Sequence, residues 1–284
     1  MKPWRRLEDG RIYLNYGPVQ MLLSAERDGT ASVELAELGA RRAVEAFTEL
    51  CENKEEMRKA AELLPDSTGN AVLDRMAVAA RKTRDPAATP MLAVAGCIAQ
   101  EACDAMRAGG ADWAFVNNGG DIALLASGLK NVTVGIMTDV GTGQIAYQKT
   151  VAPSDGIGGV ATSGLGGRSM TCGIASAAVA FAHDAATADA CATILGNAAT
   201  VNDSRVHRKR ALELDQNTDI PDLMVTVSVD PLPPPLARKA LTRARTLAES
   251  YIERGMLLGA VITVQGQTVM VPEHFCEAVT ERKG

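Results

Sequence analysis

The spacing of apolar residues predicts three helices in the first 110 residues of the chain. From Ser32, a residue type that commonly caps a helix N-terminus, apolar side chains recur every three or four positions to residue 51, with charged residues between them. Similar patterns cover 71–82 and 91–108, and Pro or Gly residues follow each of them. Each of these helices would bury one apolar face.

Short β-prone runs separated by turn residues predict antiparallel strands elsewhere. Two further helical patterns stand among the later runs. The predicted strands fall within 11–26, 112–152, 176–182, 221–230 and 259–272, and the two further helices cover 184–196 and 235–255. Segment 156–173 is rich in glycine, and segment 200–222 is polar and weakly periodic.

The order of these elements mixes helices with antiparallel strands and shows no regular strand–helix–strand alternation, which predicts an α+β fold with layered antiparallel sheets. A chain of 284 residues can form a large hydrophobic core. We therefore expect a single domain over 1–284, with two intertwined α+β halves and a weak boundary near 85–90 as the alternative.

Composition limits the partners of the protein. The formal net charge of −5 argues against a nucleic-acid partner, because phosphate binding needs an excess of Lys and Arg. The six cysteines show no metal-ligand spacing and are expected to be reduced. Neither a signal peptide nor an uninterrupted apolar run of about 18 residues is visible, so we expect a cytoplasmic protein that does not bind a membrane.

The string "VNNGGDIAL" (116–124) is the first candidate for chemistry. Asn118, Gly119 and Gly120 precede the carboxylate of Asp121. Asn-Gly is a strong turn signal, so a plain hairpin turn is one explanation. The other is a ligand site, because glycines let a ligand approach the main chain closely and Asp121 could accept hydrogen bonds or face a cation.

The segment "GIGGVATSGLGGRSMTCG" (156–173) is the second candidate, with seven glycines among eighteen residues. Consecutive N–H groups in such a loop can bind phosphate oxygens, and Arg168 could hold them with two hydrogen bonds. The segment matches neither common phosphate-loop motif, so a flexible surface loop is the alternative.

The third candidate lies in "ATADACATILGN" (186–197), where Asp189 and Thr193 are four residues apart on one helix face. Their oxygens could supply part of a Mg²⁺ site completed by substrate phosphates. Alternatively, Asp189 complements the helix dipole and Thr193 packs against small neighbours.

Together, "NNGGDIAL", "GVATSG" and "ADACATILGN", after "AVAGCIAQEACDAM", resemble the ApbE-like superfamily, whose typical member is the FAD:protein FMN transferase. The likeness is strongest over 90–200 and is greatest to a shorter cytoplasmic branch. It implies a T-fold-like α+β architecture with a flavin nucleotide, FAD, as substrate or ligand in a cleft. It also implies Mg²⁺, bound by Asp189, Thr193 and the main-chain carbonyl of Ala99.

The resemblance assigns further residues to the nucleotide. Its G-G-D corner matches 119–121, beside Asn118, and its T-S-G string matches Thr162, Ser163 and Gly164. If this chemistry is retained, Arg168 would hold the phosphates. Arg168 and Asp189 would then be the catalytic residues of an FMN transferase or, with water as the acceptor, of an FAD pyrophosphatase.

The sequence departs from the family pattern at two positions. Gln100 stands where the transferases have Lys, with Glu101 after it, and the His-containing string that follows T-S-G in the transferases is missing. Two alternatives therefore stay open: an enzyme of another class acting on a different small anionic metabolite, and a non-catalytic flavin-binding protein. A homodimer, joined through the helix at 236–254 or through edge strands, is also open.

Overall fold

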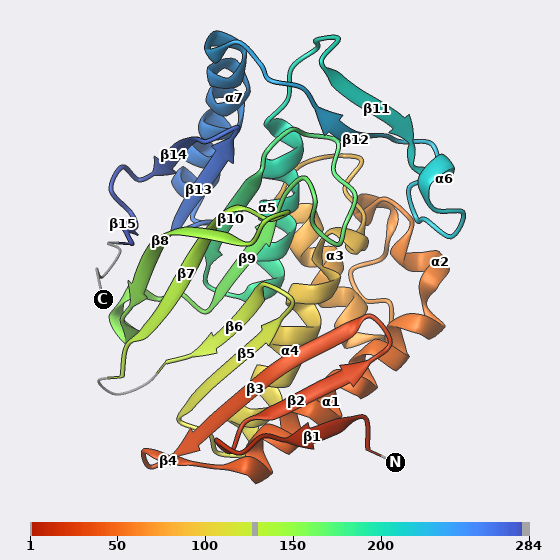
Figure 1. The fold of residues 1–284 in the computed structure, drawn as a ribbon. Coiled ribbons are helices and arrows are strands. Elements are labelled where there is room, and N and C mark those ends of the chain that lie inside the picture. The colour runs from red at the N-terminus through yellow and green to blue at the C-terminus, as the bar shows by residue number, and fades with distance from the viewer. Residues whose placement is uncertain (1, 127–129, 280–284) are drawn as a thin grey trace. The chain divides into compact units, whose positions relative to one another are not determined.

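The computed structural model describes residues 2–126 and 130–279, and Figure 1 shows its helices and strands. Contacts within the chain divide it into two compact units. The first unit comprises Met1–Val132, Ala152–Ala161 and Phe181–Ala190, and the second comprises Thr133–Val151, Thr162–Ala180 and Cys191–Gly284. Residues 85–90 lie inside the first unit.

The predicted helices of the first unit are present. They are α1 (Val33–Glu52), α3 (Ala71–Lys82) and α4 (Val94–Ala108), with the short α2 (Lys54–Met57) between the first two. The side chain of Ser32 accepts a hydrogen bond from the Leu35 N–H at 3.4 Å, as its capping role predicts. Helix α4 begins later than its apolar pattern does, because Pro90–Ala93 forms a 3₁₀ turn, η2.

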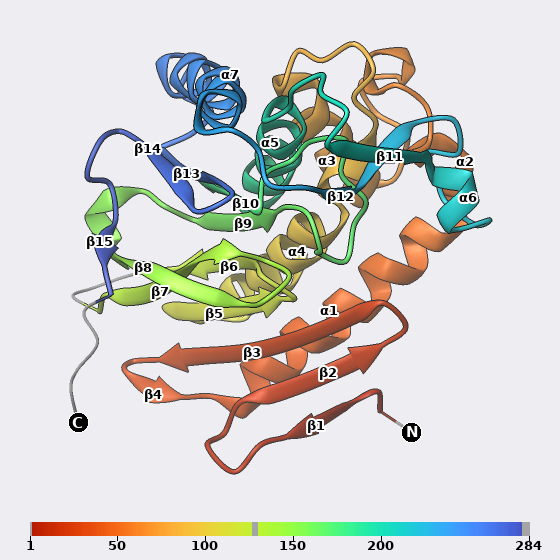
Figure 2. The ribbon, with the colours of Figure 1, turned by 45° about the horizontal axis from the view of Figure 1, so that its top comes forward.

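The strands of the first unit pair antiparallel in the order β1-β2-β3-β5-β6-β9, and β4 pairs with β3. Their bounds are β1 Trp4–Arg6, β2 Ile12–Tyr16, β3 Val19–Arg27, β4 Thr30–Ala31, β5 Trp113–Asn118, β6 Asp121–Leu125 and β9 Gly159–Ser163. Side chains of β2, β3 and β5 form one apolar core with α1 and α4, and Figure 2 shows α1 running along these strands.

Strands in three groups and the long helix α7 (Pro234–Glu253) make up most of the second unit. Strands β7 (Val132–Asp139), β8 (Gln144–Val151) and β15 (Glu277–Ala278) form one sheet, and β13 (Gly259–Val264) and β14 (Gln267–Val271) follow β10 (Ala177–Ala182) in another. A separate ladder joins β11 (Val206–Arg210) to β12 (Met224–Val229). Helix α5 (Ala185–Ala198) begins in the first unit and ends in the second, whereas α6 (Ala211–Leu214) and α7 (Pro234–Glu253) lie in the second.

The α+β class is confirmed, and two segments for which the sequence predicted no helix or strand also contain ordered elements. Segment 156–173 contains strand β9, and segment 200–222 contains β11 and α6. The apolar period is weak in both segments because glycine or charged residues occupy the pairing positions. Among the described residues, no helix combines the length and the apolar character needed to cross a membrane.

A buried carboxylate joins the three main helices of the first unit. Glu101, on α4, is 9% exposed. Its carboxylate forms an ion pair with Arg42 of α1 at 2.6 Å and another with Arg75 of α3 at 3.1 Å. Arg75 also contacts Asp104 at 2.8 Å. Two guanidinium groups therefore compensate the buried charge of Glu101 and set the position of α4.

We expect the Glu101→Gln substitution to lower the free energy of unfolding by about 2–3 kcal/mol, because it leaves two partly buried Arg side chains without their shared carboxylate. Urea unfolding followed by circular dichroism measures the change. Glu56→Gln is the matched control, since Glu56 pairs with Lys59 at the surface and its loss should cost less than about 1 kcal/mol. Equal losses for the two variants would contradict a structural role for the Glu101 network.

Candidate functional site

The first part of the site is the tight turn between β5 and β6. Asn118 pairs with Asp121 across the ladder, so Gly119 and Gly120 alone form the turn. Their φ angles are 68° and 116°, a range that side-chain-bearing residues rarely adopt. The N–H of Gly120 donates to Oδ1 of Asn117 at 2.9 Å. The predicted hairpin is confirmed, and its paired residues Asn118 and Asp121 lie on the same face of the sheet.

The second part is the first turn of helix α4. Ala93, the residue before this helix, provides no capping side chain. The carboxylate of Asp189, from α5, takes that place, accepting a hydrogen bond from the N–H of Gly96 at 2.8 Å and one from the N–H of Ala95. Asn118 donates from Nδ2 to the carbonyl of Ala95 at 3.1 Å. Three segments that are distant in the sequence therefore meet at the start of α4.

The close approach of α5 to α4 depends on Gly96. A Cβ at this position would overlap the carbonyl oxygen of Ala185 and would lie 2.7 Å from Cβ of Asp189. Gly96 itself is buried within a helix, where glycine costs about 0.5–1 kcal/mol relative to alanine. The absence of a side chain here is therefore what lets the Asp189 carboxylate reach the helix N-terminus.

The electrostatics of the site are unfavourable for two carboxylates. Burial of Asp189 raises its pKa well above the ordinary value of an aspartate, and the negative charge of Asp121 raises it further. The hydrogen bonds from Gly96 and Ala95 oppose this rise by stabilising the ionised form. The two carboxylates are thus close enough to repel each other, and a bound cation would relieve that repulsion.

The donor set suits a hard divalent cation that is completed by other oxygens. Within the described residues, no group of three or more His, Cys, Asp or Glu side chains could hold a metal ion by itself. Mg²⁺ needs fewer protein carboxylates, since water and substrate phosphates usually fill the rest of its octahedron. Asp121 and Asp189 fit such an incomplete site.

Two of the predicted metal ligands lie on the helices that carry this site. Thr193 is half-buried on α5, one turn after Asp189. Ala99 is fully buried inside α4, where carbonyls bond to the N–H four residues ahead, and it lies one turn beyond Gly96. Sequence reasoning missed Ala95 and Gly96, although the lack of a capping residue before α4 was a usable signal.

The residue that replaces the expected lysine has a different role. Oε1 of Gln100 accepts a hydrogen bond from the N–H of Ala185, the first residue of α5, at 2.9 Å, and its Nε2 donates to Asp104 at 3.1 Å. A lysine could not accept the first of these bonds, because an ammonium group has only donors. Gln100 therefore anchors the start of the helix that carries Asp189.

The glycine-rich segment 156–173 is not an open loop throughout. A Cβ at Gly158 or Gly159 would overlap the main chain of His183, Asp184 or Ala185, so both glycines serve close packing beside and within β9. In the second unit, a Cβ at Gly164 would lie 2.7 Å from the carbonyl oxygen of Ser176. Close packing of these glycines explains part of the composition that suggested a phosphate loop.

The remaining predicted ligand-binding residues belong to the second unit. Thr162 and Ser163 end strand β9 and are half-buried, whereas Gly164 is buried directly after them. Arg168 is exposed in the segment that follows. Their proposed contacts with a nucleotide stay predictions.

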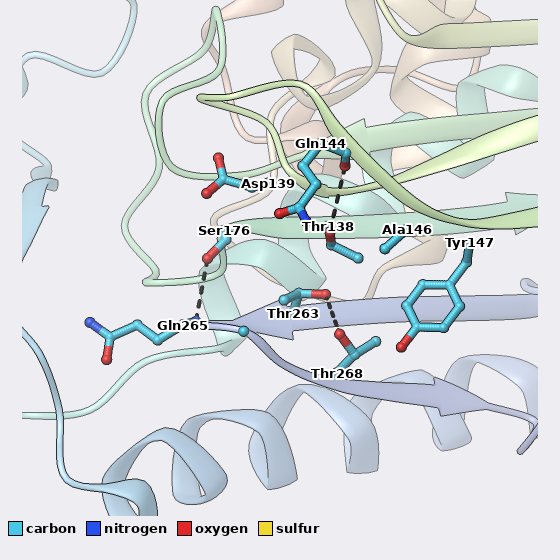
Figure 3. A pocket seen from close by; sticks show the side chains of 10 residues that line it. Thr138, Asp139, Gln144, Ala146, Tyr147, Ser176, Thr263, Gln265 and Thr268 are labelled. Atoms are coloured by element: carbon cyan, nitrogen blue, oxygen red, sulfur yellow. Dashed lines mark hydrogen bonds between the residues drawn. The ribbon is translucent and has the colours of Figure 1, made fainter. Parts of the chain in front are cut away.

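The second unit also contains a polar cavity of about 440 Å³, shown in Figure 3. Thr263 and Thr268 face each other there with their hydroxyl oxygens 2.9 Å apart, and Ser176 accepts from the N–H of Gln265 at 3.3 Å. The lining residues are Thr138, Asp139, Gln144, Ala146, Tyr147, Ser176, Thr263, Gln265, Gly266 and Thr268. None of them is basic, so this cavity is a poor match for phosphate.

Comparison with known proteins identifies the family of the chain. The family model described as AbpE bacteria matches residues 4–270. Among curated relatives, the UPF0280 protein of Methanosarcina acetivorans is 46% identical over 110 residues, which are 38% of this chain and 42% of that protein. The chain therefore matches less than half the length of this relative.

Two solved structures share the fold. The flavin transferase ApbE from Vibrio cholerae has a TM-score of 0.51 at 10% sequence identity, and the match covers 94% of this chain and 97% of that one. The ApbE protein from Thermotoga maritima has a TM-score of 0.52 at 11% identity, covering 94% and 96% of the two chains. At such identities the likeness shows an α+β ApbE-like fold.

We expect Gly96→Ala to destabilise the protein by about 1–3 kcal/mol, because the new methyl group would push α5 away from α4. Gly196→Ala is the control. It also lies in a helix, but its Cβ would meet Oγ of Ser163 at an ordinary 3.5 Å, so stability should change by less than about 1 kcal/mol. Thermal unfolding of both variants measures the difference, and a neutral Gly96→Ala would show that the helices do not need this close approach.

The raised pKa of Asp189 predicts a pH-dependent stability in metal-free protein. At pH values below the pKa of the side chain in the unfolded state, near 3.8, the carboxyl is protonated in both the folded and the unfolded state. As the pH rises from there through the higher pKa of the folded state, stability is lost, because the buried carboxyl becomes charged. Asp189→Asn should therefore gain stability relative to the wild type as pH rises to about 7.

Urea unfolding over a pH series, with chelator present, tests this expectation. Asp66→Asn is the comparison, since the Asp66 side chain faces solvent. A difference between the wild type and Asp189→Asn that stays constant with pH would contradict a buried, repelled carboxylate at position 189.

Proposed function

Because the chain belongs to the family described as AbpE bacteria, we propose that it binds FAD together with Mg²⁺ and transfers FMN to a hydroxyl acceptor. With water as the acceptor, the same reaction would hydrolyse FAD to FMN and AMP. The proposal rests chiefly on one observation, the convergence of the Asp121 and Asp189 carboxylates at the N-terminus of α4.

One of the two solved structures adds support, since the Vibrio cholerae ApbE is a flavin transferase. A purely structural role for Asp189 would account for its hydrogen bonds to α4, but it would not account for a second carboxylate beside it. Perturbed carboxyl groups that repel each other are typical of functional sites.

In the proposed reaction, the acceptor oxygen forms a bond to the FMN phosphorus while the bond from that phosphorus to the oxygen of AMP breaks. AMP leaves with the electron pair of that bond, and the acceptor loses its proton. When bound, Mg²⁺ would neutralise pyrophosphate charge and help AMP to leave.

The residues of this chain would do the positioning. Asp121 and Asp189 would hold the cation, with the Thr193 hydroxyl and the Ala99 carbonyl as further proposed ligands. The N–H groups of Ala95 and Gly96 keep Asp189 oriented and favour its ionised form. A carboxylate fixed in this way loses little further freedom when the ligand binds.

The other proposed contacts concern the nucleotide. The main chain at Gly119 and Gly120 leaves room for a close approach, and Asp121 is at its edge. Arg168 would hold the phosphates, and Thr162, Ser163 and Gly164 would contact the nucleotide.

The decisive experiment measures FAD binding and AMP release by the purified protein, with Mg²⁺ and with chelator. We expect Mg²⁺-dependent binding that weakens at least about tenfold, or 1.4 kcal/mol, in Asp189→Asn and in Asp121→Asn. AMP should form only with Mg²⁺. Asp66→Asn, at an exposed position, is the control and should bind as the wild type does.

Each other result has a definite meaning. FAD binding without AMP release would refute the hydrolysis of FAD and leave either FMN transfer to another hydroxyl or a non-catalytic flavin-binding protein. Absence of FAD binding, with a folded protein by circular dichroism, would refute the proposal and favour another anionic metabolite. Unchanged Mg²⁺ dependence in both Asp variants would refute the metal site.

A further inference from the structure

One segment of the second unit exposes apolar side chains that a folded protein usually buries. We call residues 205–230 the arm: it contains β11, α6, β12 and the connection between α6 and β12. Five of the ten exposed large apolar side chains among the described residues lie in it, each exposed by 42–48%. They are Leu212, Leu214, Leu223, Met224 and Val227. Such clustering marks interaction surfaces.

The arm is an ordered platform for these side chains. The N–H of Ala211 donates to the carbonyl of Leu223 at 2.9 Å, and the N–H of Leu212 donates to that of Pro221 at 3.2 Å. At its base, the N–H of Thr226 donates to the carbonyl of Thr171 at 2.7 Å. Main-chain hydrogen bonds therefore hold the apolar residues of α6 and of the β12 start close together, as the cyan and light-blue ribbon in Figure 1 shows.

Charges of both signs flank the apolar residues. The strand β11 is basic, and its Lys209 and Arg210 are exposed. The connection is acidic and carries Asp215, Asp219 and Asp222, and Glu213 of α6 adds a further acidic side chain beside it. Arg210 forms an ion pair with Asp222 at 3.3 Å, which is at the surface and contributes little to stability.

We propose that two copies of this chain associate through their arms about a two-fold axis, with the basic strand of one copy against the acidic connection of the other. A two-fold interface uses the same surface on both copies, so that surface must complement itself. The arm meets this condition, since it combines exposed apolar residues with a basic strand and an acidic connection. A partner of one charge sign would be repelled by one of the two sides.

The charges of β11 also limit how the arms can pair. Among the described residues β11 pairs only with β12, so its other edge is open to a further strand. Lysine and arginine on such an edge oppose indiscriminate strand pairing. Opposite charges on the second copy would remove this obstacle in one orientation only, which gives the association its specificity.

Analytical ultracentrifugation of the full chain tests the apolar centre. We expect the wild type to dimerise, and Leu223→Lys to weaken dimerisation at least about tenfold because it places a charge in the interface. Leu63→Lys is the matched control, since Leu63 is 78% exposed in the first unit, outside the arm. A wild type that stays monomeric at every concentration tested would overturn the proposal, as would equal effects of the two substitutions.

Charge reversal tests the pairing itself. The first variant carries Lys209→Glu and Arg210→Glu, so the end of its β11 becomes acidic like the connection. The second carries Asp219→Lys and Asp222→Lys, so its arm is mainly basic. Each variant alone should dimerise at least about tenfold more weakly than the wild type, whereas their mixture should form heterodimers, because each altered side then meets an opposite charge.

Recovery on mixing also shows that both variants are folded. Dimers of either variant as stable as those of the wild type would overturn the proposal, and so would a mixture that stays monomeric while circular dichroism reports native folds. Raised salt should weaken the wild-type dimer, since exposed charges are screened.

Discussion

The candidate site depends on the hydrogen bonds that the carboxylate of Asp189 accepts at the start of helix α4. They join α5 to α4 in the absence of a local capping residue, and they require a glycine at position 96 so that the helices can approach. Asn118 binds the same turn of α4 from the sheet. The hairpin, one long helix and the start of another are thereby fixed around a single point.

A structural and a chemical explanation of Asp189 make different demands on its surroundings. A carboxylate at a helix N-terminus is worth about 0.3–1 kcal/mol, and up to about 2 kcal/mol in a partly buried geometry. Asp121 works against that gain, because its charge raises the pKa of Asp189 in the same sense as burial does. Helix capping alone needs no second carboxylate, so the pair of carboxylates supports the proposed cation site.

Sequence patterns predicted the parts of this arrangement whose signals are local. The 3.6-residue period located α1 and α4, and the Asn-Gly-Gly-Asp string located the hairpin. Strand β9 was missed, because Gly158 and Gly159 gave the segment the composition of a loop while their actual role is close packing against a distant main chain. The meeting of Asp121 with Asp189 depends on strand pairing and helix packing, which no local pattern encodes.

The glutamine at position 100, where the resemblance predicts a lysine, also has a physical consequence for the site. Gln100 uses its carbonyl oxygen to accept from the first N–H of α5, so the residue that could have carried a positive charge instead fixes the helix of Asp189. Glu101, the next residue, is part of an ion-pair network with Arg42 and Arg75. In the proposed site, the positive charge that two repelling carboxylates need would come from the N–H groups of α4 and from the proposed cation. Such a site would depend on that cation more strongly than a site that also contains a lysine.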